Sequence, residues 1–248
     1  MIPKKIHYCW LGGDPLSPLA EKCIASWKKY CPDYEIILWN ESNYDFTKHP
    51  YMRQALEAQK WGFVPDYARL DIVWQHGGIY LDTDVELVKS LDDLLENKFY
   101  AGFESDKFVA LGLGFGAEAG HPLLKKMMED YDNYSFVNED GTLNLLPSPA
   151  IQTELLLKMG LSADTGDIQT MTDGVVIYPT RFFAPRNAAR LPEALPDSYS
   201  VHHYAASWCD DQIKRKLLFA VKKIINVCFG EKAVFFVELK RKIFDRGK

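Results

Sequence analysis

The sequence has no run of about 18 apolar residues, no C-x-x-C pair and no G-x-G-x-x-G motif. The first absence leaves no candidate for a membrane-spanning helix, and the N-terminal residues lack the apolar core of a secretory signal peptide. The five cysteines are odd in number, which favours buried thiols in a reducing compartment over a disulfide framework. Without the glycine motif, a Rossmann dinucleotide site is not supported. We therefore expect a cytoplasmic protein.

Positive charge is scarce over most of the chain and concentrated at its end. Residues 212–248 contain eleven Lys or Arg and three Asp or Glu, a balance of +8, so the other residues carry −13 (−5 − 8 = −13). An acidic bulk argues against nucleic acid as a partner. The basic tail alternates apolar clusters with lysines and arginines. It suits either helices lying on an anionic membrane surface or terminal helices packed on the domain with a solvated basic face.

The 248 residues suit one large domain or two small ones with a sizeable core. We divide the chain into a domain at 1–211 and a helical tail at 212–248. The apolar patterns predict an α/β domain whose first three elements form a βαβ unit with a parallel strand pair. The predicted strands are 4–11, 34–39, 79–81, 98–103, 108–116, 175–179 and 199–208, and the predicted helices are 18–30, 50–60, 65–76, 123–131 and 149–159. Residues 132–148 and 181–197 are expected to be irregular, and the first of these could cover an acceptor cleft.

The most informative stretch is residues 77–86. Two glycines turn the chain, Ile79 to Leu81 form a short apolar strand, and Asp82 and Asp84 follow directly. Ligands bind at the carboxyl ends of strands in open α/β sheets, so these carboxylates are placed where chemistry is usually done. They could share one divalent cation, or one could hold the metal and the other a ligand hydroxyl. Mg²⁺ and Mn²⁺ prefer such oxygen ligands.

Two further groups of polar residues could serve the same site. Asp66 lies in the first turn of a predicted helix, and Arg69 follows three residues later on the same face, either as an ordinary surface pair or as a pair held beside the carboxylates. His202 and His203 are adjacent on a predicted strand. Neighbouring side chains on a strand point to opposite faces, so at most one of the two can enter a given site. A neutral imidazole suits Mn²⁺ or a diphosphate.

The run from Phe63 to Arg69, followed by Gly77 to Glu86, resembles the DXD-motif sugar transferases of glycosyltransferase family 32. That family includes bacterial capsular-polysaccharide transferases and fungal initiating mannosyltransferases. The same spacing is similar to that of the glucosylating domains of large clostridial toxins. Residues 2–12 and 201–208 are similar to the ends of the family, so the resemblance covers about residues 1–208. It implies a GT-A fold, with a Rossmann-like mixed sheet flanked by helices, a nucleotide-sugar donor and Mn²⁺ or Mg²⁺.

The resemblance also implies roles for individual residues. Asp84 binds the metal, and Asp82 contacts the ribose, the sugar or the metal, with Thr83 between them in the donor-binding stretch. Asp66 and Arg69 grip the donor sugar. His202 or His203, of which we favour His202, closes over the diphosphate. The remaining donor-binding residues implied are Cys9, Trp10 and Leu11 under the base, and Ser207 and Trp208 beside the diphosphate. One departure concerns the acceptor side, because relatives often carry Thr-Gly-Pro where this chain has Pro147-Ser148-Pro149.

These expectations describe a metal-dependent, retaining hexosyltransferase that uses a UDP-sugar or GDP-mannose, with the UDP-sugar favoured. The expected acceptor is a saccharide, lipid-linked if the tail binds the inner face of the cytoplasmic membrane, in capsular or other surface polysaccharide synthesis. No residue is a convincing covalent nucleophile, so we favour front-face attack by the acceptor hydroxyl. The alternatives are an Asp-x-Asp phosphatase and a nucleotide-sugar-binding module without turnover.

Overall fold

The computed structural model describes residues 1–186 and 192–205. The predicted basic tail and the candidate residues Ser207 and Trp208 lie outside this part of the chain. No helix among the described residues combines the length and the apolar character that crossing a bilayer would require.

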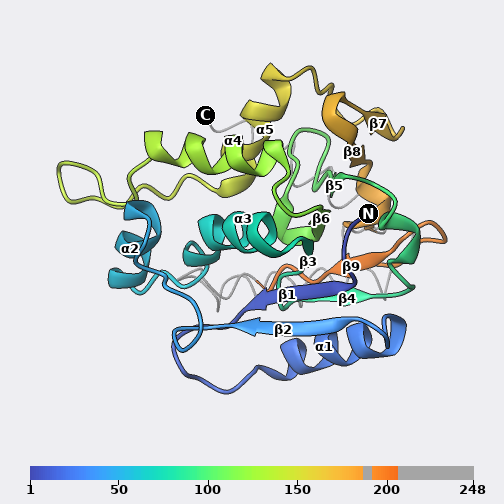
Figure 1. Ribbon diagram of the computed structural model, residues 1–248, viewed down its shortest axis with the longest axis horizontal. Coiled ribbons are helices and arrows are strands. Elements are labelled where there is room, and N and C mark those ends of the chain that lie inside the picture. The colour runs from blue at the N-terminus through green and yellow to red at the C-terminus, as the bar shows by residue number, and fades with distance from the viewer. Residues whose placement is uncertain (187–191, 206–248) are drawn as a thin grey trace, which may run out of the picture.

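A seven-stranded mixed sheet runs through the centre of the molecule in the order β2-β1-β3-β6-β5-β8-β7 (Figure 1). The pairs β1–β2, β1–β3 and β5–β8 are parallel, and β3–β6, β5–β6 and β7–β8 are antiparallel. The strands are β1 (Lys5–Cys9), β2 (Glu35–Trp39), β3 (Gly78–Tyr80), β5 (Phe99–Gly102), β6 (Phe115–Ala117), β7 (Gln169–Thr170) and β8 (Val175–Tyr178). The expected α/β architecture and the parallel βαβ pair are therefore confirmed.

A separate two-stranded ribbon pairs β4 (Val85–Leu87) with β9 (Ser200–His202) in antiparallel register. This ribbon brings residues that are more than a hundred positions apart in the sequence against one another. The sequence predicted β9 within a longer strand at 199–208 but gave no signal for β4. Three residues are too few to show an alternating pattern of apolar side chains.

Helix α1 (Pro18–Tyr30) covers one face of the sheet, and its bounds match the prediction. Ser17 caps the helix by accepting a hydrogen bond from the Ala20 backbone N–H at 3.2 Å. The helix holds the ribbon in place, because Trp27 donates from its indole nitrogen to the Val85 carbonyl at 2.7 Å. Ser26 accepts from the Leu87 backbone N–H at 2.9 Å. These bonds fix the chain just after the candidate carboxylates.

The other face is covered by helices α3 (Val64–His76) and α4 (Pro122–Asp130), with α2 (Pro50–Glu57) and α5 (Ser148–Lys158) beside them (Figure 1). The predicted start of α3 near Pro65 and its end at Gly77 are confirmed. Gly77 has φ 61° and Gly78 has φ 108°, values that favour glycine. A Cβ at Gly78 would also lie 2.8 Å from His7 Nε2. The turn into β3 therefore requires the glycine pair.

The structure corrects the prediction of one strand over residues 108–116. The chain there forms a short 3₁₀ turn at Leu111–Leu113 and only then enters β6. Gly114, at φ 120°, redirects the backbone between the two. The turn carries Gly112 against the end of β3, where its carbonyl accepts from the Asp82 backbone N–H at 3.3 Å.

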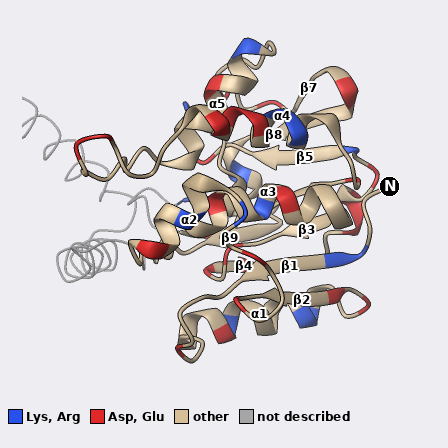
Figure 2. Cartoon of the chain, turned by 60° about the vertical axis from the view of Figure 1, so that its left-hand side comes forward, with Lys and Arg blue, Asp and Glu red and all other residues tan. Residues whose placement is uncertain are grey.

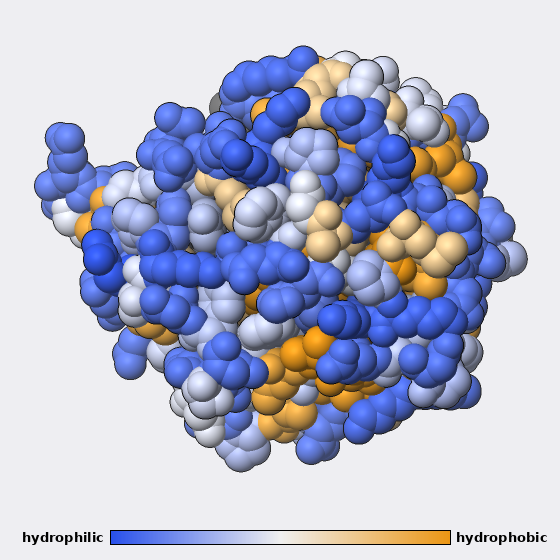
Figure 3. All heavy atoms as spheres, viewed as in Figure 1, coloured by the Kyte–Doolittle hydropathy of each residue, from blue (hydrophilic) through white to orange (hydrophobic). Residues whose placement is uncertain are grey.

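Charged residues lie mainly on the surface helices and loops, while the central strands are mostly uncharged (Figure 2). The face seen in Figure 3 is largely hydrophilic, with smaller hydrophobic areas between the polar side chains. The buried polar exceptions, which include Asp66, Arg69 and Ser148, therefore need a specific explanation.

Candidate functional site

Asp82 and Asp84 leave the carboxyl end of β3, as the sequence predicted. The strand is buried along its length, and the Leu81 backbone N–H continues the pairing by donating to the His7 carbonyl at 3.0 Å. A turn then begins, closed by the Val85 N–H donating to the Asp82 carbonyl at 3.0 Å. Both carboxylates are thereby fixed at the edge of the sheet where β1 also ends.

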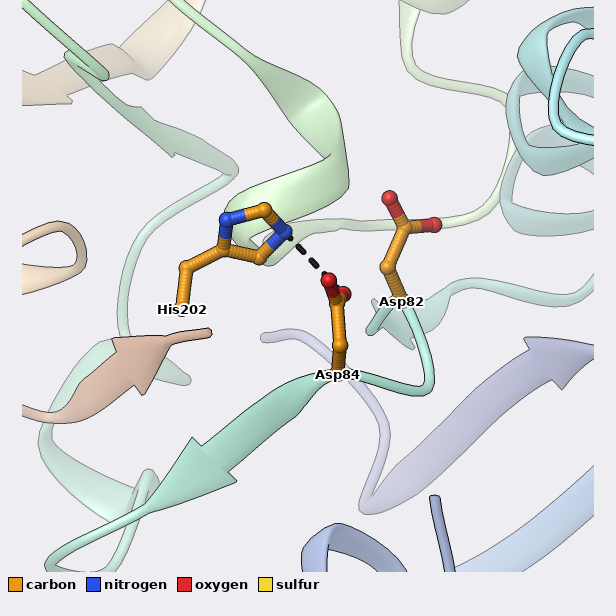
Figure 4. A group of neighbouring side chains, drawn as sticks. All are labelled: Asp82, Asp84 and His202. Atoms are coloured by element: carbon orange, nitrogen blue, oxygen red, sulfur yellow. Dashed lines mark ion pairs between the residues drawn. The ribbon is translucent and has the colours of Figure 1, made fainter. Parts of the chain in front are cut away.

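The segment His202–Ala205 wraps around Asp84. The imidazole Nε2 of His202 forms an ion pair with Asp84 Oδ1 (Figure 4), at a distance of 3.0 Å. The Ala205 backbone N–H donates to the second carboxylate oxygen at 2.9 Å, and the His203 N–H donates to the Asp84 carbonyl at 2.9 Å. The late strand therefore contacts Asp84, while the implied role of its histidine at the diphosphate stays a prediction.

His203 does not join this group, which corrects its inclusion among the candidate metal ligands. Its Nε2 lies 2.8 Å from Glu86 Oε2, which also accepts from Lys22 Nζ at 2.7 Å. The side chains of His202, the last residue of β9, and of His203 therefore reach different carboxylates, in line with the alternation of side chains along an extended chain. Of the two imidazoles, the structure brings only that of His202 to the Asp84 carboxylate.

Burial and charge act in opposite directions on this pair. Burial alone would raise the pKa of Asp84, but the charge and hydrogen bond of His202 and the bond from Ala205 outweigh it, and the pKa lies below its usual value. Burial lowers the pKa of His202, but Asp84 and then Asp82 outweigh it and leave the pKa raised. Each partner therefore favours the charged form of the other.

Asp82 has a different environment. Burial raises its pKa, the Arg69 guanidinium opposes this, and the charge of Asp84 adds to it. Arg69 Nη1 lies 3.8 Å from Asp82 Oδ2. Two carboxylates two positions apart in the sequence thus differ in pKa, because one is paired with an imidazole and the other lies at the edge of a buried guanidinium.

Asp66 and Arg69 form a buried ion pair, which overturns the surface-pair interpretation. Each residue is 4% exposed. Arg69 donates from Nη2 to Asp66 Oδ1 at 2.6 Å and from Nε to the Pro65 carbonyl at 3.0 Å. Through its third nitrogen it reaches Asp82. Helix α3 therefore presents a fixed cation between two carboxylates that are 16 positions apart in the sequence.

Ser148 is a site residue that sequence reasoning did not identify. It begins α5 and donates from its hydroxyl to Asp66 Oδ1 at 2.8 Å. Burial raises the pKa of Asp66 to about 6, although Arg69 and Ser148 both favour its charged form. The Pro147-Ser148-Pro149 departure was assigned to the acceptor side, but the structure places its serine on the Asp66–Arg69 pair. The prolines marked a helix start without indicating what that start would face.

Gly112 is a second residue that the sequence did not single out. A Cβ added there would lie 2.2 Å from Asp82 Oδ2 and 3.0 Å from Arg69 Nη1. The backbone at Gly112 therefore forms a wall of the site that has no room for a side chain. The Asp82 carboxylate therefore lies directly against the backbone of this turn.

The remaining predicted residues lie at or near the same edge of the sheet. Cys9 ends β1 and is buried, which raises the pKa of its thiol to about 12. Trp10 and Leu11 follow and are partly exposed, with the Trp10 indole donating to the Asp14 carbonyl at 2.6 Å. Thr83 lies in the turn between the two carboxylates and is partly exposed. Their contacts with a donor stay predictions.

The donor set fits a divalent cation. One ligand atom from each of Asp82, Asp84 and His202 lies within 4.8 Å of the others. Two carboxylates and one imidazole form a set that Mn²⁺ accepts and that Mg²⁺ accepts through its oxygens. His202 Nδ1 is buried and has no hydrogen-bond partner among the described residues. The imidazole is therefore not fully committed to the protein around it.

Comparison with known proteins shows that this chain is similar to glycosyltransferases. Residues 17–100 match the family described as "Glycosyltransferase sugar-binding region containing DXD motif". The chain is 30% identical over 143 residues to inositol phosphoceramide mannosyltransferase 3 of Schizosaccharomyces pombe, covering 54% of this chain and 38% of that protein. It is 25% identical over 248 residues to an uncharacterized glycosyltransferase of Acanthamoeba polyphaga mimivirus, covering 92% of each. The solved PaToxG glycosyltransferase superposes with a TM-score of 0.50 at 21% identity, covering 63% of this chain and 69% of that one.

Proposed function

We propose that this chain, whose residues 17–100 match the glycosyltransferase sugar-binding region containing a DXD motif, transfers a hexose from a nucleotide-sugar to a saccharide acceptor. The resemblance to DXD sugar transferases and the GT-A fold are confirmed. The chain spans only 38% of the length of the yeast mannosyltransferase, so its own activity and substrates are inferred from its site. The observation that carries the proposal is the meeting of Asp82, Asp84 and His202 beside the buried Asp66–Arg69 pair.

Asp82, Asp84 and His202 would hold Mn²⁺ or Mg²⁺. A bound divalent cation supplies Lewis-acid stabilisation for the negative charge of a leaving diphosphate. Asp84, whose pKa is lowered, provides a carboxylate that is charged at neutral pH. The expected ligand roles of Trp10, Leu11, Ser207 and Trp208 complete the nucleotide side of this proposal.

Asp66 is suited to hold the donor sugar. Its Oδ1 accepts from both Arg69 and Ser148, and no described residue donates to Oδ2. Oδ2 can therefore accept a hydrogen bond from a sugar hydroxyl, while Arg69 fixes the orientation of the carboxylate. We favour a UDP-hexose as donor and retain GDP-mannose, since the yeast relative is named as a mannosyltransferase.

The reaction would proceed by front-face attack with retention at the anomeric carbon. The acceptor hydroxyl oxygen forms the new bond to that carbon, and the electron pair of the broken bond leaves on the diphosphate oxygen. The hydroxyl proton passes to that same oxygen. The anomeric centre becomes oxocarbenium-like, and the carboxylates of Asp82 and Asp66 stabilise its positive charge. A glycosyl adduct on Asp or Glu, detected by mass spectrometry, would remove this mechanism.

The test is release of free hexose from UDP-glucose, UDP-galactose, UDP-N-acetylgalactosamine and GDP-mannose with Mn²⁺ and no acceptor. We expect slow hydrolysis of one donor, lost on chelation and in Asp84→Asn. Asp33→Asn is the matched control, because Asp33 pairs with Lys4 at the opposite end of β1 at 2.6 Å. Hydrolysis of p-nitrophenyl phosphate instead would indicate the Asp-x-Asp phosphatase, and donor binding without hydrolysis would indicate a binding module.

A lipid-linked acceptor is part of the proposal. The yeast relative is named for transfer to inositol phosphoceramide, a lipid, and residues 212–248 carry a balance of +8. We propose that this tail holds the domain of residues 1–211 at the inner face of the cytoplasmic membrane during surface or capsular polysaccharide synthesis. Replacing the lysines within 214–223 by glutamate should reduce sedimentation with anionic vesicles, and unchanged sedimentation would count against the membrane role.

A further inference from the structure

We propose, resting on the function above, that Arg186 binds the terminal phosphate of the nucleotide donor, on the side of the site closed by residues 202–205. The sequence predicted residues 181–197 only as a loop, and the family resemblance covers this loop without assigning any residue in it a role. The structure places Arg186, the last residue described before position 187, against the ring of Tyr204, which in turn packs on His202.

A chain of contacts links Arg186 to the carboxylates. Its guanidinium carbon lies 4.1 Å from the centroid of the Tyr204 ring. The Tyr204 ring lies 4.2 Å from the His202 ring, edge to face at 88°. His202 in turn lies 3.0 Å from Asp84. Two ring contacts and one ion pair therefore link Arg186 to the Asp84 carboxylate, which would hold the metal, and Arg186 is exposed.

The backbone supports this placement. Tyr204 has φ 51°, a left-handed conformation that is strained for a non-glycine residue. The same turn aims the Ala205 N–H at Asp84 Oδ2 at 2.9 Å. One strained turn thus fixes both the hydrogen bond from Ala205 to Asp84 and the Tyr204 ring on which the Arg186 guanidinium rests. Strain of this kind is concentrated at functional sites.

Charge explains why a cation is needed here. A leaving diphosphate carries more negative charge than one divalent cation held by two carboxylates can neutralise. Arg69 and Lys22 are committed to Asp66 and Glu86. In the described part of the chain no carboxylate lies within ion-pair distance of Arg186. A planar guanidinium matches phosphate oxygens with two parallel hydrogen bonds. Arg186 can therefore leave the Tyr204 ring and meet the phosphate as its charge grows.

Arg181 provides a matched control. It lies on the same loop and also rests on an aromatic ring, with its guanidinium carbon 4.8 Å from the Phe182 centroid. It differs in having a carboxylate partner, Asp197, at 3.2 Å. Replacing either arginine by glutamine removes one charge and one ring contact from the loop.

The experiment compares UDP and GDP with UMP and GMP by calorimetry in Mn²⁺. We expect Arg186→Gln to weaken binding of the preferred nucleoside diphosphate about tenfold, the effect of losing one charged hydrogen bond. The affinity of Arg186→Gln for the monophosphate should stay within about twofold of wild type. The affinities of Arg181→Gln for the diphosphate and for the monophosphate should also stay within about twofold of wild type. An equal loss for diphosphate and monophosphate would make Arg186 a structural residue and overturn the proposal. Unchanged diphosphate affinity would overturn it while leaving the proposed function intact. Failure of the wild-type chain to bind any of the four nucleotides would overturn both.

Discussion

Replacing Gly112 by alanine should separate the geometry of the site from the stability of the fold. The new Cβ would lie 2.2 Å from Asp82 Oδ2 and 3.0 Å from Arg69 Nη1. Ordinary contact begins near 3.4 Å, so the carboxylate must move by about 1 Å, a displacement that can cost an enzyme about a hundredfold in rate. Gly112 is not among the glycines with positive φ, so its backbone accepts alanine without strain.

The atom that must move is the end of a side chain, so the cost falls on the site. We expect Gly112→Ala to fold, to melt within a few degrees of wild type, and to lose about a hundredfold in donor hydrolysis with Mn²⁺. Melting is followed by circular dichroism, and hydrolysis by release of the nucleoside diphosphate.

Gly116→Ala is the control, because it creates a similar clash away from the carboxylates. Its Cβ would lie 2.5 Å from Cε1 of the buried Tyr100 ring. Overpacking of this kind costs about 1–3 kcal/mol of stability, so this variant should melt earlier and keep its activity when folded. Wild-type hydrolysis by Gly112→Ala, or unfolding of Gly112→Ala, would refute the placement of Asp82.

Three further outcomes follow from the described contacts. His202→Gln should weaken Mn²⁺ binding about tenfold or more by calorimetry, whereas His203→Gln should leave it unchanged. Equal losses would contradict the separation of the two imidazoles. Burial lowers the pKa of His7 from 6.5 to about 4, so the neutral imidazole stabilises the fold fully above pH 6.5. This stabilisation is lost as the pH falls from 6.5 toward 4, and the free energy of unfolding should drop by about 3 kcal/mol over that range. Urea unfolding at several pH values should show this drop in the wild type and not in His7→Gln. Asp66 is charged mainly above its pKa of about 6, so donor hydrolysis should fall as the pH drops through that value. Ser148→Ala removes a hydrogen bond that favours the charged form, so the midpoint of this pH–rate profile should move upward. An unchanged midpoint would show that Ser148 does not act on Asp66.

Local patterns predicted the elements whose signals are contained within them. The bounds of α1 follow from Ser17 as cap, Pro18 at the first turn and an apolar face that must be buried. The end of α3 follows from Gly77, which alone suits the conformation needed there. The strand before Asp82 follows from three apolar residues after a glycine pair. Each of these depends on forces between residues close in sequence.

The contacts that define the site join residues far apart in sequence. Local sequence patterns could not predict these contacts. Ser148 meets Asp66 across 82 positions, and the Gly112 backbone meets Asp82 only because a 3₁₀ turn interrupts an apparent strand. Arg186 reaches Tyr204 through a loop that shows no periodicity.

The sequence by itself determined that two carboxylates would stand at the end of a buried strand, and that one histidine of the late pair at most could join them. Only the tertiary structure decided that this histidine is His202, that Asp66 and Arg69 are buried rather than exposed, and that a serine orients their carboxylate. The physical reason is that side-chain alternation and helix caps are local properties, whereas burial and pairing of charges depend on which distant segments the core brings together.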